Sequence, residues 1–125
     1  MAWCPDVVDS HRKFGCAAGA TPALVSDPTL WLRDGLVDEE RHELFSAMMT
    51  SNLPAIADAC ADLIYVVLGT AIAYGIDLRP VWDAVHEANM AKVGGGKRAD
   101  GKVQKPEGWQ APDVAGILAK QEALK

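Results

Sequence analysis

Apolar side chains recur every three to four residues along most of the chain, which is the period of an α-helix. No segment of the sequence alternates apolar and polar residues with the period of two that a half-buried strand requires. Proline in the first turn and glycine after the last turn mark several boundaries, and Asp27, Asn52 and Asp77 are the predicted N-caps. The pattern therefore predicts an all-α protein, with helices over residues 5–14, 28–49, 53–74, 78–93 and 113–124.

Two acidic clusters fall on the second and third predicted helices, which are joined by a short connection at residues 51–54. Residues three or four apart share a helix face, so Glu39, Glu40 and Glu43 can point together, as can Asp58 and Asp62. A short connection makes two helices antiparallel neighbours, so the clusters can face each other. Such carboxylates repel one another, and a divalent cation with oxygen ligands relieves the repulsion.

Glu40 is the most informative member, because it lies inside the apolar arc of the second helix. A glutamate in a core stripe needs a partner. From the pattern alone, a metal ion and a structural ion pair with Arg33 or another buried base are equally good partners. Asp58 also fits a solvated first turn, where a helix N-terminus favours acids, but Asp62 lies too deep in the helix for that explanation.

Length and composition narrow the choice of function. The 125 residues suit one domain over 1–125, and the net charge of −5 argues against a broad nucleic-acid surface. Three scattered cysteines provide neither a disulfide framework nor a zinc site and fit a reducing compartment. The N-terminus lacks the pattern of a signal peptide, and the apolar run 63–73 is too short to cross a bilayer. We therefore expect a cytoplasmic protein without membrane contact.

The fourth predicted helix leads into a loop that is rich in glycine and lysine, residues 94–112. Asn89 lies in the predicted buried stripe of that helix, which also contains Leu78, Trp82, Val85, His86 and Val93. His11, His42 and His86 are expected to be packed or hydrogen-bonded core residues. The loop's basic residues suit a mobile flap that meets phosphate, although a solvated linker fits its composition equally well. It is no Walker motif, because the preceding strand and the Gly-Lys-Ser/Thr ending are missing.

Several segments, in this order and spacing, resemble the all-α nucleoside triphosphate pyrophosphohydrolases, which include MazG, phosphoribosyl-ATP pyrophosphohydrolase and the dimeric dUTPases. The resemblance covers residues 5–118. The matching segments are Arg33-x-x-Leu36-Val37-x-Glu39-Glu40-x-x-Glu43-Leu44, Asp62-Leu63-Ile64-Tyr65-Val66-Val67, Gly75-Ile76-Asp77, Val85-His86-x-x-Asn89-Met90-x-Lys92 and Lys105-Pro106-x-x-Trp109-x-x-Pro112-Asp113.

One position departs from the family pattern. The family carries Glu-x-x-Asp on the second of its two acidic helices, which would place a glutamate three residues before Asp62. That position is Ala59. Asp58 is the only nearby carboxylate, and it lies four residues before Asp62 on the same face, so it is the candidate replacement. A shorter side chain from a shifted position puts catalytic efficiency in question more than the fold.

The resemblance implies a four-helix-bundle-type fold that is completed by oligomerisation, as a homodimer or homotetramer. It implies Mg²⁺-dependent cleavage of a nucleoside triphosphate to a monophosphate and pyrophosphate, with Mn²⁺ as an alternative metal. The metal ligands would be Glu40, Glu43, Asp58 and Asp62, and Glu39 would position a water or a second metal. The catalytic set is then Glu39, Glu40, Glu43 and Asp62, and the substrate-binding set is Arg33, Asn89, Lys92, Lys102, Lys105 and Trp109.

A second class of function stays open at this point. The chain could be a non-catalytic, oligomeric helical module that binds a metal or a basic partner through its acidic face. Ala59 is the feature that favours this alternative. The sequence contains no motif that recognises a particular nucleotide base, so it does not specify which nucleotide is bound.

Overall fold

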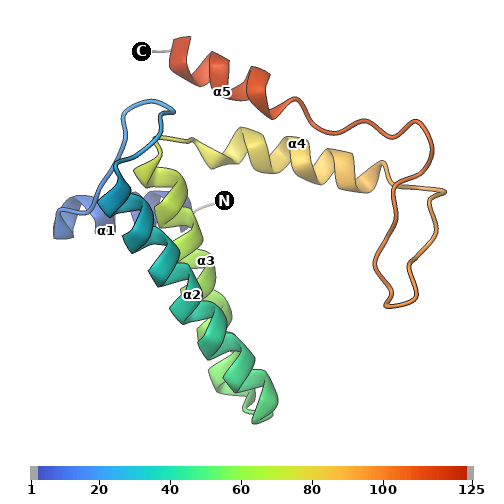
Figure 1. The fold of residues 1–125 in the computed structure, drawn as a ribbon, viewed down its shortest axis with the longest axis horizontal. Coiled ribbons are helices and arrows are strands. Elements are labelled where there is room, and N and C mark those ends of the chain that lie inside the picture. The colour runs from blue at the N-terminus through green and yellow to red at the C-terminus, as the bar shows by residue number, and fades with distance from the viewer. Residues whose placement is uncertain (1–2, 124–125) are drawn as a thin grey trace. The chain divides into compact units, whose positions relative to one another are not determined.

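The computed structural model describes residues 3–123, and within them it contains five helices and no strand beyond a single isolated bridge (Figure 1). The all-α prediction is therefore confirmed. The chain forms two compact units, residues 1–76 and residues 77–125, which are described separately. The single domain predicted for residues 1–125 stays a prediction. The helices are α1 (Trp3–Phe14), α2 (Asp27–Met49), α3 (Leu53–Ala73), α4 (Leu78–Met90) and α5 (Val114–Ala123).

An antiparallel pair, α2 and α3, forms the centre of the first unit (Figure 1). Ser51 has a positive φ of 52° in the turn between them, and the Asn52 side chain caps α3 by accepting from the Ala55 N–H at 3.2 Å. The prediction of Asn52 as an N-cap is confirmed. The prediction of Asp27 is wrong, because Ser26 has the extended backbone of a cap and its hydroxyl accepts from the Thr29 N–H.

Small side chains lie at the α2·α3 interface. Ala47 of α2 and Ala59 of α3 are buried, with exposed fractions of 6% and 3%. Val7 of α1, which packs against α3, is the most deeply buried apolar side chain among the described residues. Small residues at a helix interface allow the two backbones to approach closely. The carboxylates carried by α2 and α3 are thereby brought near one another.

The C-terminal end of α3 is held by a buried arginine and by the loop that follows α1. Arg33 donates from Nε to Thr70 Oγ1 at 3.2 Å and from Nη2 to the Val66 carbonyl at 2.8 Å. Burial of the guanidinium lowers the pKa of Arg33. Gly69 makes room for this group, since a Cβ there would lie 2.6 Å from Arg33 Nη2 and 2.7 Å from His11 Nε2.

The second unit comprises α4, the loop after it and α5. Asp77 caps α4 as predicted, and the Gln121 side chain of α5 bonds both the N–H and the carbonyl of Asp77. The helix ends at Met90 rather than at residue 93, because the chain turns back into a hairpin through glycines with positive φ. The predicted stripe is not buried: Trp82 is 49% exposed and Val93 84%. Within this unit α5 covers too little of α4 to bury it.

Many large apolar side chains of the first unit are exposed. They include Leu32, Phe45, Met48, Ile64, Tyr65 and Val67. By length and composition alone, α3 could also cross a bilayer, with a mean hydropathy of 1.8 over its most apolar window. The central helix of a water-soluble bundle meets the same criteria. The prediction from residues 63–73 considered too short a segment, because α3 has 21 residues and meets the length and hydropathy criteria.

Candidate metal-binding active site

Three carboxylates meet between α2 and α3. Glu40 and Glu43 lie one turn apart on α2, and Asp62 faces them from α3. One oxygen atom from each side chain lies within 4.8 Å of the others. The sequence predicted that these three residues would meet, and the antiparallel α2·α3 pair brings them together. We call Glu40, Glu43 and Asp62 the carboxylate cluster.

Glu40 carries the clearest sign of a missing partner. Its Oε2 atom is buried, and no hydrogen-bond partner for it exists among the residues that the structure describes. Burial raises the pKa of Glu40, and the neighbouring charges of Glu43, Asp62 and Glu39 raise it further. A protonated Glu40 would also share a hydrogen bond with Glu43. Without a cation, ionisation of Glu40 is therefore less favourable in this site than in water.

The two partners that the sequence left open for Glu40 can now be compared. Arg33 donates to Thr70 and Val66 on α3 and forms no ion pair with Glu40. Within residues 3–123, no lysine or arginine lies within ion-pair distance of the carboxylate cluster. The structural ion pair is therefore the wrong alternative for the described residues. A buried acceptor without a basic partner instead fits a bound cation.

The donor set suits a hard divalent cation. It consists of carboxylate oxygens from three side chains, which Mg²⁺ and Mn²⁺ both accept. Two oxygens on opposite sides of one Mg²⁺ lie about 4.2 Å apart, since each Mg–O bond is about 2.1 Å. Adjacent ligand oxygens of Mg²⁺ lie closer, about 3.0 Å apart, so the three side chains would move inward from their 4.8 Å limit to hold one ion together. The residues present therefore fit the metal that the resemblance implied.

The other acidic residues predicted for the site have different positions. Glu39 is exposed beside Glu40, and its charge contributes to the raised pKa of Glu40. Asp58 is exposed and is not part of the carboxylate cluster. Ala59, where the family pattern has a glutamate, is 3% exposed and occupies the helix interface. The geometry thus supports three ligands. It gives no support for the prediction that Asp58 replaces the missing glutamate.

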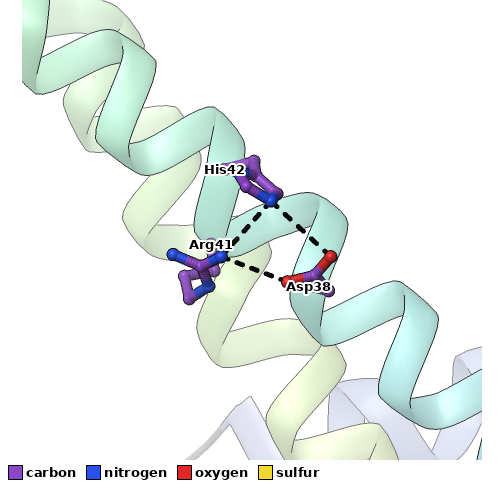
Figure 2. Close-up of polar contacts among 3 residues, drawn as sticks. All are labelled: Asp38, Arg41 and His42. Atoms are coloured by element: carbon purple, nitrogen blue, oxygen red, sulfur yellow. Dashed lines mark hydrogen bonds and ion pairs between the residues drawn. The ribbon is translucent and has the colours of Figure 1, made fainter.

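The basic residues of α2 that are next to the cluster in sequence form exposed contacts with Asp38. Arg41 Nη2 lies 3.2 Å from Asp38 Oδ1, and His42 Nε2 lies 3.6 Å from Asp38 Oδ2. Figure 2 shows these three side chains and the contacts between them. All three side chains are more than half exposed. The expectation that His42 is a packed core residue is therefore wrong, and His86 is likewise exposed. His11 is buried, with Nδ1 2.9 Å from the Ala17 carbonyl, as predicted.

Three of the predicted substrate-binding residues of the second unit line one pocket, and Trp109 contacts two of these three. Lys92, Lys102 and Lys105 line a pocket of about 420 Å³. Trp109 lies within 5.3 Å of Lys92 Nζ and 4.9 Å of Lys105 Nζ, measured to its ring centre. Asn89 is exposed and does not line this pocket. Arg98 does line it but was not singled out from the sequence, although the Arg98-x-Asp100-Gly101 turn was a usable signal.

Residues 10–89 match the family model described as phosphoribosyl-ATP pyrophosphohydrolase. The matched span contains α2, α3 and the whole carboxylate cluster. The chain belongs to this family. The phosphoribosyl-ATP pyrophosphohydrolase family is part of the all-α MazG-like superfamily, so the resemblance stated from the sequence is confirmed. The protein is therefore a member of a pyrophosphohydrolase family with an all-α, MazG-like fold.

A viral protein provides a second comparison. An uncharacterized protein of Acanthamoeba polyphaga mimivirus is 46% identical over 50 residues. The aligned part covers 40% of this chain and 20% of the viral protein. The chain thus spans only a fifth of this curated relative, which is itself uncharacterized.

Proposed function

We propose that the protein is a Mg²⁺-dependent nucleotide pyrophosphohydrolase that cleaves a nucleoside triphosphate to a monophosphate and pyrophosphate. Family membership supports the reaction class. The observation that carries the metal dependence is the buried, unpartnered Oε2 of Glu40 inside the carboxylate cluster. A cluster of acids that only faced solvent would have no such atom.

Glu40, Glu43 and Asp62 are the proposed metal ligands. When bound, the metal neutralises phosphate charge and lowers the pKa of a water molecule that attacks phosphorus. Glu39 is exposed next to Glu40, so it can accept a proton from the attacking water while the other carboxylates hold the ion. Asp58 is proposed only as an outer group that hydrogen-bonds hydrating water, since it lies outside the cluster.

The proposed phosphate contacts are polar and basic residues of the second unit. Asn89, Lys92, Lys102 and Lys105 are the proposed partners of the phosphate chain, because amide and ammonium donors stabilise its charge. Arg33 fits this role less well than the sequence suggested, since Nε and Nη2 both bond to α3. Its proposed role is to fix α2 against α3, and therefore Glu40 against Asp62.

A non-catalytic metal-binding module is the second candidate function. The buried Ala59 favours it, because the family's fourth carboxylate is replaced by a methyl group in the helix interface. With three ligands instead of four, the site is suited to one ion rather than two. The proposed enzyme would then depend on Glu39 for the proton transfer that a second metal ion could otherwise assist.

A pyrophosphate-release screen tests the enzymatic proposal. The purified chain is incubated with each canonical and oxidised nucleoside triphosphate and with phosphoribosyl-ATP, with Mg²⁺, Mn²⁺ or EDTA. We expect release with at least one substrate, dependent on the metal and lost in Glu43→Gln. The control variant Glu122→Gln makes the same change on exposed α5 and should retain activity. Metal binding without turnover of any substrate would favour the non-catalytic module.

A homodimer or homotetramer and a cytoplasmic location are further parts of the proposal. The exposed apolar side chains of α2 and α3 support the assembly, because a second copy could cover them. The location rests on the sequence expectation alone.

A further inference from the structure

The loop after α4 forms a hydrogen-bonded hairpin rather than the open flap that its composition suggested. Lys97 and Val103 form an antiparallel bridge, and the Arg98 N–H donates to the Lys102 carbonyl at 2.7 Å. The Gln104 N–H donates to the Gly96 carbonyl at 3.0 Å. Gly95 lies so close to the Gln104 carbonyl that a Cβ would clash. The hairpin therefore has a defined backbone on which charged side chains can be arranged.

Four cationic side chains surround the pocket of about 420 Å³ on this hairpin. They are Lys92, Arg98, Lys102 and Lys105, and we call this feature the basic pocket. Asp100 holds Arg98 through two hydrogen bonds, one of them 2.9 Å from Arg98 Nε to Asp100 Oδ1. The three lysines form no ion pair within the described residues. Unpaired like charges around one concavity attract a multiply charged anion.

Trp109 organises two of these lysines. Its Nε1–H donates to the Ala88 carbonyl of α4 at 2.7 Å, which fixes the indole against the end of that helix. Lys92 Nζ lies 5.3 Å and Lys105 Nζ 4.9 Å from the ring centre, within the range of cation–π attraction. Both ammonium groups also belong to residues that line the pocket. The ring is therefore already engaged by cations, which argues against a direct role as a stacking platform for a base.

We propose that the basic pocket is a preformed site for an oligophosphate chain, and that Trp109 is a positioning residue that holds Lys92 and Lys105 in it. The identification of the natural ligand as the phosphate chain of the nucleotide substrate rests on the proposed function. Oligophosphate fits better than nucleic acid, because the chain has a net charge of −5 and the cations converge on one pocket. The lysines act as point charges toward phosphate, whereas the guanidinium fork of Arg98 is already bound to Asp100 and only lines the pocket.

Binding of inorganic tripolyphosphate in EDTA tests the pocket without the metal site. Isothermal titration calorimetry compares wild type with the double variant Lys102→Gln/Lys105→Gln. The matched control is Lys13→Gln/Lys120→Gln, which removes two charges outside the pocket. We expect the pocket variant to bind at least about tenfold more weakly, since each charge-assisted contact is strong. The control should stay within about twofold. Equal losses in both variants would show a general charge effect and overturn the proposal.

Substitution of Trp109 tests its positioning role. Trp109→Leu removes the aromatic face and should weaken tripolyphosphate binding about fivefold. Trp109→Phe keeps an aromatic face without the N–H, so it should recover most of the affinity. Trp82→Leu, on exposed α4, is the control for loss of an indole. If Trp109 served only to stabilise the hairpin, the Phe and Leu variants would bind equally weakly, and the positioning role would be refuted.

Two further measurements separate this proposal from the proposed function. Glu43→Gln should retain tripolyphosphate binding in EDTA while it loses pyrophosphate release. If wild type binds tripolyphosphate but hydrolyses no nucleotide, the oligophosphate site is supported and the proposed enzymatic activity is refuted. Turnover without measurable tripolyphosphate binding would do the reverse. A single-stranded oligonucleotide is the competing ligand. If it binds wild type more tightly than tripolyphosphate does, and if Lys102→Gln/Lys105→Gln abolishes that binding, the ligand class is nucleic acid and not oligophosphate.

Discussion

Glu43→Gln is the most informative perturbation, because it keeps the size of the side chain and removes one charge from the carboxylate cluster. At 4.8 Å in water, two ionised carboxylates repel by about 0.9 kcal/mol. Glu43 has two such neighbours, Glu40 and Asp62, and salt screens part of this repulsion. We therefore expect the metal-free variant to be more stable than wild type by roughly 1 kcal/mol, or about 4 °C in Tm.

Magnesium should reverse this order. A ligand that binds only the folded state at a hundred times its Kd stabilises the protein by about 2.7 kcal/mol. Wild type should gain close to this amount, whereas the variant has lost a ligand and should gain much less. Thermal melts followed by circular dichroism, in EDTA and across a Mg²⁺ titration, measure both effects. Glu122→Gln on α5 should behave like wild type in both series.

A structural role for Glu43 predicts the opposite result. Removing one member of a buried ion pair strands its partner and lowers stability without metal. If Glu43→Gln melts below wild type in EDTA, and Mg²⁺ shifts neither protein, the reasoning from the carboxylate cluster fails. Mg²⁺ stabilisation of equal size in both proteins would also refute it, because the ion would then bind elsewhere.

The pKa of Glu40 is raised above its ordinary value of 4.5, so the folded metal-free state binds more protons than the unfolded state. Its stability should fall as pH rises through the raised pKa, and Mg²⁺ affinity should increase over the same range, as pH-dependent melts and titrations can show. Gly69→Ala places a Cβ 2.6 Å from Arg33 Nη2 and 2.7 Å from His11 Nε2, so calorimetry should show a loss of about 1–3 kcal/mol. Tyr65→Glu puts a charge on the exposed apolar face of α3, so light scattering should show wild type as an oligomer and the variant as a smaller species; a monomeric wild type would exclude the shared core.

The sequence by itself predicted the five helices and the three members of the carboxylate cluster, although it also placed Asp58 among the metal ligands. Helical periodicity gives both the five elements and the shared faces, because residues three and four apart must lie together on any helix. The short connection at residues 51–54 makes α2 and α3 antiparallel, which places Glu40 and Glu43 opposite Asp62. Local geometry is enough for the shared faces, and the family resemblance singled out these residues as metal ligands.

The tertiary structure decided which partners the charged side chains actually have. Arg33 and Glu40 share an apolar arc, but only the packing against Gly69 shows that Arg33 bonds to α3 and leaves Glu40 Oε2 unpartnered. The hairpin around the basic pocket was equally hidden, because residues 97 and 103 pair through the backbone, and backbone pairing leaves little trace in composition. Hydrogen bonds and burial depend on atoms that are distant in sequence, so periodicity could propose these groups but could not pair them.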